Sequence, residues 1–254
     1  MESGALRKAI GNAQLKKLLA TSHMYRLLSF CFLYPSEEMQ QALRDGSLAS
    51  QMKTISQTLP YASKIREEVV TFISSLTDNV SKVRPSSIQT EYDVLFGQSE
   101  ELPCPPYETS YNTEQIFSTS RKLADIAGFY RAFGLSTSGT WHDRVDHVAA
   151  ELEFMHFLTF KEAHAIASGK QSEAQLTKDA SLKFLKEHVL EWVGSFAENL
   201  QKVSKVPYYA SLGELTRKFI MLEGNCLGLN TKLDSKPRDT KPPEDAGCGV
   251  QCGL

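Results

Sequence analysis

The sequence predicts an all-α protein, a single-domain helical bundle, and three observations carry this prediction. Apolar residues recur at helical spacing along almost the whole chain. No stretch shows the sustained apolar and polar alternation with β-branched enrichment that is typical of a strand. Proline, glycine and N-capping residues divide the chain at intervals typical of helices. With 254 residues, 41% of them hydrophobic, the chain is long enough to bury a full core.

The composition excludes several classes of function. The 28 basic and 30 acidic residues nearly cancel, which argues against coating of nucleic acid, because such binding depends on phosphate neutralisation. The most apolar run, Leu27 to Tyr34, is far shorter than the roughly 20 residues of a membrane span, so no membrane insertion is expected. Five cysteines without framework-like spacing indicate a reducing compartment. We therefore expect a cytoplasmic protein.

The first part of the chain divides into helices at its capping residues. A long helix is expected from about Ala5 to Tyr34, ending before the first proline. Ser36 then has the position of an N-cap, with Glu37 and Glu38 in the first turn of the next helix, where carboxylates favour the helix dipole. Shorter helices are expected to follow as far as Leu59.

Two further helices are expected before the proline-rich loop, which is the segment from Pro103 to Tyr111. The first starts at Pro60 and carries one apolar stripe, which consists of Ile65, Val69, Phe72 and Leu76. The second has Ser86 or Ser87 as its N-cap and is closed by Gly97. Its apolar positions are Tyr92, Leu95 and Phe96.

The helix after the proline-rich loop is expected to begin at a capping box. Asn112 and Gln115 have the required spacing, and the helix should pass through Tyr130 and end at Gly134. A short, polar and flexible linker is expected near residues 134–141.

The remaining sequence predicts three helical stretches and a tail. The most apolar helix is expected from about His142 to Ser168, followed by helical sequence from Glu173 to Val203 and a final helix from Tyr208 to Glu223. Residues 231–254 are rich in Lys, Asp, Pro and Gly, so they should form a disordered tail behind a helical domain that spans residues 1–230.

The helix expected from His142 has an unusual density of ionisable groups, which are Asp143, Asp146, His147, Glu151, Glu153 and His156. Glu153 and His156 have the Glu-x-x-His spacing of di-iron bundles, but the sequence has no second copy. His142 and Asp143 are similar to the pair of HD-type metallohydrolases, whose further ligands are missing here. We therefore expect no metal ligands. A helical metal-dependent hydrolase or oxidase using the His142–His156 helix is the alternative function.

No other motif supports catalysis, and we expect no catalytic residue. Residues 134–140 nearly spell a P-loop but lack its lysine, and no strand precedes them. Cys104 has no identifiable base beside it. Cys248 and Cys252 make only half a zinc site, and the sequence leaves their role open.

The same helix can instead be a binding surface. On a helical wheel, one side is expected to be core, through Val145, Val148, Leu152, Met155 and Thr159. Asp143, Asp146 and Glu153 group on another side, with Phe157 next to them. Such a strip suits a ligand that combines guanidinium groups with an apolar segment, because arginine forks onto carboxylates.

Structural explanations of these residues stay open beside the binding hypothesis. The acids can form a solvated face or ion pairs with other helices. His147 can be a buried, hydrogen-bonded core histidine. Tyr107 and Tyr111 can simply hold the proline-rich loop in place.

Three blocks together resemble the signature blocks of the TorD/DmsD/NarJ family of redox-enzyme maturation chaperones. They are Tyr92–Gly97, Pro103–Tyr111 and Asp146–Met155, in the family's order and separation. The segment Leu123–Leu135 further resembles the subgroup that serves type II DMSO-reductase-family enzymes, such as ethylbenzene and dimethylsulfide dehydrogenases and selenate and chlorate reductases.

The resemblance implies a chaperone that binds the twin-arginine leader and the apo form of a molybdopterin oxidoreductase's catalytic subunit. It implies help with cofactor insertion before export, no enzymatic activity, no resident cofactor, and a monomer or a domain-swapped dimer. The family's Asp-His pair corresponds to Asp146 and His147, and its leader-binding surface to the loop with Tyr107, Glu108 and Tyr111. Because a twin-arginine leader has two cations beside an apolar segment, we expect the loop and the acidic strip of Asp143, Asp146 and Glu153 beside Phe157 to be two walls of one peptide site.

Overall fold

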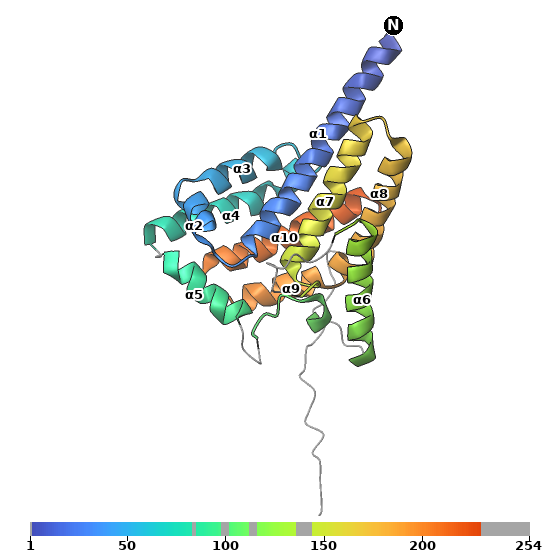
Figure 1. Ribbon diagram of the computed structural model, residues 1–254. Helices are drawn as coiled ribbons and strands as arrows, with labels where there is room; N and C mark the ends of the chain where they lie inside the picture. Colours follow the sequence, from blue (N-terminus) through green and yellow to red (C-terminus); the bar gives the residue numbers. More distant parts are fainter. Residues whose placement is uncertain (1, 83–84, 98–101, 112–115, 136–143, 230–254) are drawn as a thin grey trace, which may run out of the picture.

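The computed structural model describes residues 2–82, 85–97, 102–111, 116–135 and 144–229 (Figure 1). Within these ranges the regular structure is helical and no strand is formed, which confirms the all-α prediction. The helices are α1 Glu2–Cys31, α2 Glu37–Arg44, α3 Ser47–Ser56, α4 Ala62–Lys82, α5 Pro85–Phe96, the 3-10 turn η1 Glu108–Tyr111, α6 Ile116–Ala132, α7 Val148–Ala167, α8 Gln171–Phe184, the π turn η2 Leu185–Val189, α9 Leu190–Val203 and α10 Pro207–Cys226. None of them combines the length and apolar character needed to cross a membrane.

The corner between α1 and α2 is fixed by hydrogen bonds to both sides. The Ser36 hydroxyl accepts from the Met39 amide at 3.3 Å, so the predicted N-cap is confirmed. The Pro35 carbonyl accepts from the side-chain amides of Gln40 and Gln89, at 3.2 and 3.0 Å. Because Gln89 belongs to α5, this corner is held against a helix far away in the sequence.

The two helices before the proline-rich loop confirm the predicted stripe and correct one predicted cap. The α4 stripe of Ile65, Val69, Phe72 and Leu76 is buried as predicted, although the helix begins at Ala62 rather than Pro60. Helix α5 begins at Pro85, so Ser86 and Ser87 lie inside the helix and the serine cap was wrong. Proline suits the first helical position, because its missing N–H would have no partner there and its φ is already helical.

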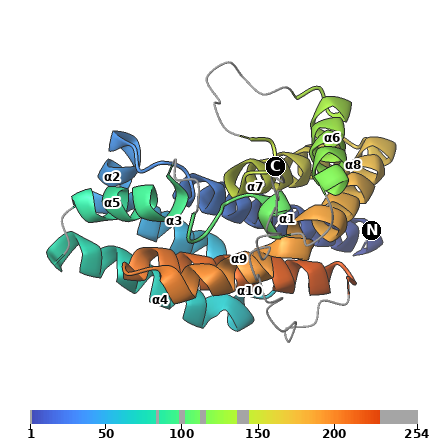
Figure 2. The ribbon, with the colours of Figure 1, turned by 90° about the horizontal axis from the view of Figure 1, so that it is seen from below.

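The core is built around two pairs of helices. Helices α1 and α7 pack along their lengths (Figure 1), and α10 packs on both α9 and α4. Viewed from below, α9 and α10 run side by side across the molecule (Figure 2). The buried side chains form one hydrophobic cluster that draws on helices from α1 to α10.

The stretch predicted as helical from Glu173 to Val203 is helical throughout, with a local change of winding. Helix α8 passes through the π turn η2 into α9 without leaving helical geometry. Such a turn shifts the helix face by one residue. It places His188 and Trp192 inside the molecule, with exposed fractions of 2% and 1%.

The start of α7 corrects the sequence prediction. The helix begins at Val148 and not at His142, because His147 has the extended backbone of an N-cap, with φ −72° and ψ 139°. Asp146 therefore precedes the helix and cannot share a helix face with Glu153. Several predictions fall outside the described residues. They concern His142 and Asp143, the capping box of Asn112 and Gln115, residues 136–141 of the linker predicted at 134–141, and the tail at 231–254.

Candidate functional site

The proline-rich loop and the segment before α7 lie against each other, as the sequence predicted. The Val148 amide donates to the Pro106 carbonyl at 2.8 Å, and the Glu108 amide donates to the Asp146 carbonyl at 3.0 Å. Tyr107 and His147 form an antiparallel bridge between them. We call this junction of residues 106–109 with residues 144–148 the clasp.

Asp146 lies inside the clasp with its carboxylate fully engaged. Its side chain is completely buried. Arg144 donates from Nε to Oδ1 at 3.0 Å and from Nη2 to Oδ2 at 2.8 Å. Thr109 donates from its amide and its hydroxyl to Oδ2, at 3.1 and 2.8 Å. The expected exposed strip of Asp143, Asp146 and Glu153 is therefore wrong for Asp146, whose charge is neutralised within the chain.

His147 and Tyr107 form the centre of the clasp. The His147 Nδ1 accepts from the Ala149 amide at 3.1 Å and so caps α7. Its ring meets the edge of Tyr107, with ring centroids 5.6 Å apart, and the Arg144 guanidinium lies 4.4 Å from the centre of the Tyr107 ring. The explanation of His147 as a buried, hydrogen-bonded histidine is confirmed.

Glu108 ties the clasp to the π turn and to α6. Its buried carboxylate accepts from Lys122 Nζ at 2.8 Å and lies 3.0 Å from His188 Nδ1. Burial acts to raise the pKa of Glu108, but the hydrogen bonds from His188 and Lys122 outweigh it and hold that pKa below its usual value. Glu108 is therefore an ionised structural anchor within the fold.

Glu151 is a second buried carboxyl behind the clasp, one turn into α7. Its Oε2 accepts from the indole N–H of Trp192 at 2.9 Å. Burial, followed by the charge of Glu108, raises the pKa of Glu151 well above its usual value. The interior around Glu151 therefore favours its protonated form, whereas the partners of Glu108 favour the ionised form.

Tyr111 and Phe157, two more of the predicted site residues, are packed within the fold. The Tyr111 ring lies on Trp192, with centroids 5.5 Å apart, and its hydroxyl is 3.7 Å from the Cys104 sulfur. Burial raises the pKa of Cys104 to about 12, which leaves the thiol protonated. Phe157 packs on Phe133, on the side of α7 where α6 ends.

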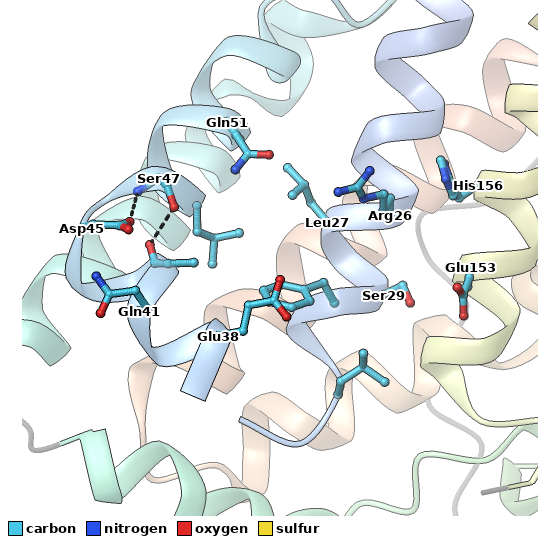
Figure 3. A pocket seen from close by; sticks show the side chains of 14 residues that line it. Arg26, Leu27, Ser29, Glu38, Gln41, Asp45, Ser47, Gln51, Glu153 and His156 are labelled. Atoms are coloured by element: carbon cyan, nitrogen blue, oxygen red, sulfur yellow. Dashed lines mark hydrogen bonds between the residues drawn. The ribbon is translucent and has the colours of Figure 1, made fainter. Parts of the chain in front are cut away.

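An open groove lies between α1, α2, α3 and α7 (Figure 3). Helix α1 forms its floor, α2 and α3 form one wall, and α7 forms the other. The groove has a volume of about 560 Å³, and we call it the α1 groove. Its lining residues are Arg26, Leu27, Ser29, Phe30, Leu33, Glu38, Gln41, Ala42, Asp45, Ser47, Leu48, Gln51, Glu153 and His156.

Carboxylates stand on both walls of the α1 groove. Glu38 and Asp45 come from the α2 side and Glu153 from α7, and all three are exposed (Figure 3). The Ser47 amide donates to Asp45 Oδ1 at 2.9 Å, which is the largest reason that the pKa of Asp45 is lowered. Arg26 is the single basic residue among the lining side chains, so the groove carries a net negative charge.

His156 adds a hydrogen-bond acceptor to the α7 wall. The Ser22 hydroxyl donates to the His156 carbonyl at 3.0 Å, so the contacts of Nδ1 with Ser22 Oγ and Ser22 O require that Nδ1 carries the proton. Burial lowers the pKa of His156, which keeps the ring neutral. Its Nε2 is then an acceptor. Carboxylates, an acceptor nitrogen and an apolar floor together suit a cation on an apolar chain.

Of the seven predicted site residues that the structure describes, Glu153 is the one that lines the α1 groove. Glu38 and Asp45 were missed as binding residues, although Glu38, Gln41 and Asp45 recur at the i, i+3 and i+7 spacing of one helix face. Within the described part of the chain, no group of three or more His, Cys, Asp or Glu side chains could hold a metal ion.

Comparisons with known proteins point in one direction. Residues 60–198, more than half of the chain, match the family model described as nitrate reductase delta subunit. A perchlorate reductase assembly chaperone protein from Dechloromonas aromatica is 26% identical over 211 residues, covering 82% of this chain and 89% of the relative. A dimethyl sulfide dehydrogenase assembly chaperone protein from Rhodovulum sulfidophilum is 28% identical over 216 residues, covering 80% and 78%. A chaperone protein TorD from Vibrio cholerae is 26% identical over 182 residues, covering 63% and 79%.

Proposed function

This chain belongs to the nitrate reductase delta subunit family, the TorD/DmsD/NarJ group of redox-enzyme maturation chaperones, and on that premise we propose that it binds the twin-arginine leader and apo form of a molybdopterin oxidoreductase's catalytic subunit. In the cytoplasm it holds this client and assists cofactor insertion and assembly before export. The family expected from the three sequence blocks is confirmed by the match to residues 60–198.

The names of the relatives support both the role and the class of client. They are assembly chaperones for a perchlorate reductase and a dimethyl sulfide dehydrogenase, and a TorD chaperone. The dimethyl sulfide dehydrogenase relative agrees with the resemblance of Leu123–Leu135 to the chaperones of type II DMSO-reductase-family enzymes. We therefore propose a client of that type.

The observation that carries leader binding is the pair of acidic walls in the α1 groove. Consecutive side chains of an extended peptide point in opposite directions. One of two adjacent arginines can therefore reach Glu38 and Asp45 while the other reaches Glu153 (Figure 3). The apolar segment of the leader then lies on the floor, which is formed by Leu27 and Phe30 of α1 and by Leu33 just after it.

The clasp supports this site without touching the peptide. It fixes the first turn of α7 through the His147 cap, and the Ser29 hydroxyl of α1 donates to the Ala149 carbonyl at 2.8 Å in the same turn. Glu153 stands one turn further along α7. In this proposal Asp146, His147 and Glu108 are positioning residues, and Glu153 contacts the leader.

The test is calorimetric titration of the full chain with the leader peptide of its client. Glu153→Gln and Asp45→Asn should each weaken binding about fivefold to tenfold, because each removes a carboxylate that pairs with a guanidinium. Glu37→Gln is the matched control: it removes a neighbouring exposed carboxylate, whose side chain is 96% exposed and which does not line the groove. Unchanged affinity in both groove variants would overturn the site.

Peptide specificity provides the second arm of the test. A leader with both arginines replaced by glutamine should bind at least tenfold more weakly than the natural leader. Equal affinity for the two peptides would identify a general helical adaptor for apolar segments. In the native host, loss of the chaperone should leave the client without its molybdenum cofactor, as measured by elemental analysis of the purified client.

A further inference from the structure

A second cavity lies across the α1–α7 pair from the α1 groove. It has a volume of about 460 Å³, is as open to solvent as the α1 groove, and is lined by residues of α1, α7, α8 and α10, with Pro60 at one side. Leu18, Leu182 and Leu227 supply apolar walls. We call it the α8–α10 cavity. It shares no lining residue with the α1 groove.

Glu162 opens into this cavity without a counter-ion in contact. Its side chain is 92% buried, since its exposed fraction is 8%. Among the described residues no hydrogen bond or ion pair reaches its carboxylate. Lys178 also lines the cavity, and its charge acts to lower the pKa of Glu162, but burial outweighs it and keeps that pKa raised. The residue is buried, but its carboxylate oxygens have no partner among the described residues and stay open to the cavity, where a hydrogen-bond donor can reach them.

Glu223 of α10 opens into the same cavity. It is also 8% exposed, and its Oε2 accepts from the Tyr61 hydroxyl at 2.8 Å. Burial raises the pKa of Glu223 to about 7, and the charge of Glu162 adds to that rise, so the two carboxyls sense each other. Within the described chain neither of them forms an ion pair with Lys17 or Lys178, the basic residues of the lining.

We propose that the α8–α10 cavity binds one organic cation, an ammonium or guanidinium group on an apolar stem, between Glu162 and Glu223. Such a cation gives the unpaired oxygens of Glu162 charged hydrogen-bond donors and offsets the repulsion between the two carboxylates. Its stem packs on Leu18 and Leu182. The site is independent of leader binding, because Glu162 and Glu223 take no part in the α1 groove.

The cation can come from a basic side chain of a partner polypeptide or from a free amine, and both have the same recognising chemistry. The probe for the chemistry is n-butylguanidinium, added to the full isotope-labelled chain and followed by amide chemical shifts around α8 and α10. Its neutral isostere n-butylurea is the ligand control. N-acetylarginine methylamide, which carries flanking peptide groups, distinguishes the two sources.

Saturable binding of n-butylguanidinium, without binding of n-butylurea, is the expected result. Glu162→Gln and Glu223→Gln should each weaken it at least about tenfold, since each removes a charge-assisted hydrogen bond. Both substitutions keep the side-chain shape, and the amide oxygen at position 223 still accepts from Tyr61, so the fold should be retained. Asp179→Asn, which removes an exposed carboxylate from α8 outside the cavity, should leave binding unchanged.

Three outcomes would overturn the site: no saturation at tens of millimolar probe, equal shifts with n-butylurea, or undiminished binding in both glutamine variants. Binding of N-acetylarginine methylamide as tight as that of n-butylguanidinium assigns the cavity to a polypeptide side chain. Exclusion of the methylamide assigns it to a free amine. Leader affinity should be unchanged in the same variants, and this measurement distinguishes the α8–α10 cavity from the α1 groove.

Discussion

The guanidinium of Arg144 lies forked across the carboxylate of Asp146, with donor to acceptor distances of 3.0 and 2.8 Å. The same guanidinium faces the ring of Tyr107. A carboxylate beside an aromatic ring is the arrangement that would bind a leader arginine well. Arg144 of the chain itself therefore occupies the position beside Asp146 and Tyr107 in which the sequence predicted a leader arginine.

Arg144→Gln tests whether this place has a structural role only. The Arg144 side chain is 43% exposed, so we expect its loss to lower the free energy of unfolding by only about 1 kcal/mol. Leader affinity should stay within about twofold of the wild type, because the α1 groove is unchanged. Urea unfolding and calorimetric titration measure the two quantities. A clear gain in affinity would instead show that the leader competes with Arg144 for Asp146.

Asp146→Asn should act on stability more strongly than Arg144→Gln. The carboxylate accepts four hydrogen bonds from Arg144 and Thr109 while fully buried. Removing its charge should cost about 1.5–3 kcal/mol, the range for hydrogen bonds to charged groups. Leader binding should fall only at temperatures where the variant begins to unfold, as a melting curve recorded alongside the titration would reveal.

His147 offers a way to separate capping from packing. His147→Asn keeps a capping acceptor at the start of α7 but loses the ring contact with Tyr107. His147→Ala loses both, so its stability loss should exceed that of the asparagine variant by about 1 kcal/mol. Thermal or urea unfolding of the pair checks this difference. Equal losses would mean that the Nδ1 contact adds nothing to the helix start.

Much of the fold follows from patterns that are local in the sequence. The α4 stripe of Ile65, Val69, Phe72 and Leu76 is spaced by helical turns, and Ser36 precedes two acids, so both were predictable. The start of α7 was not, because the apolar and acidic period runs through Asp146, although residues 145–146 form a turn and His147 has an extended backbone. A helical wheel that includes residues before the true helix start assigns them to a helix face although they are not helical.

The site depends on relationships that a single sequence does not display. The carboxylate of Asp146 meets Arg144 two residues away and Thr109 from a distant loop, and the pattern of acids gives no sign of either partner. Glu153 faces Glu38 and Asp45 only because α7 packs along α1. The π turn that buries His188 has no mark in the sequence, since its residues are ordinary helix formers.

Glu151→Gln should flatten the dependence of stability on pH. The raised pKa keeps Glu151 protonated in the folded state, while the unfolded state ionises above its ordinary value near 4.5. Folding therefore takes up a proton, and stability falls by about 1.4 kcal/mol per pH unit above that value until the folded pKa is reached. Glutamine stays neutral and its oxygen still accepts from Trp192. The variant should match the wild type near pH 4 and exceed it near pH 8 in urea unfolding.

The ionisation of Glu223 should add a second fall of stability with rising pH, confined to a defined pH range. Its pKa is about 7 in the folded state and near 4.5 in the unfolded state. The stability that the protonated carboxyl contributes is complete below pH 4.5 and is lost as the pH rises to 7, a change of roughly 3 kcal/mol at most. Glu223→Gln should remove this slope between pH 4.5 and 7 and leave the slope above pH 7 in place.

Tyr61→Phe is the matched variant for this window. The Tyr61 hydroxyl donates to Glu223 Oε2 and so acts to lower the pKa of that carboxyl. Without the hydroxyl the folded pKa rises further, so the fall in stability should extend above pH 7 instead of ending there. Unfolding curves between pH 4 and 9 separate the two variants, because Glu223→Gln removes the contribution of Glu223 to the slope and Tyr61→Phe extends that contribution above pH 7. An identical pH profile in Tyr61→Phe and wild type would mean that the Tyr61 hydroxyl does not set the ionisation of Glu223.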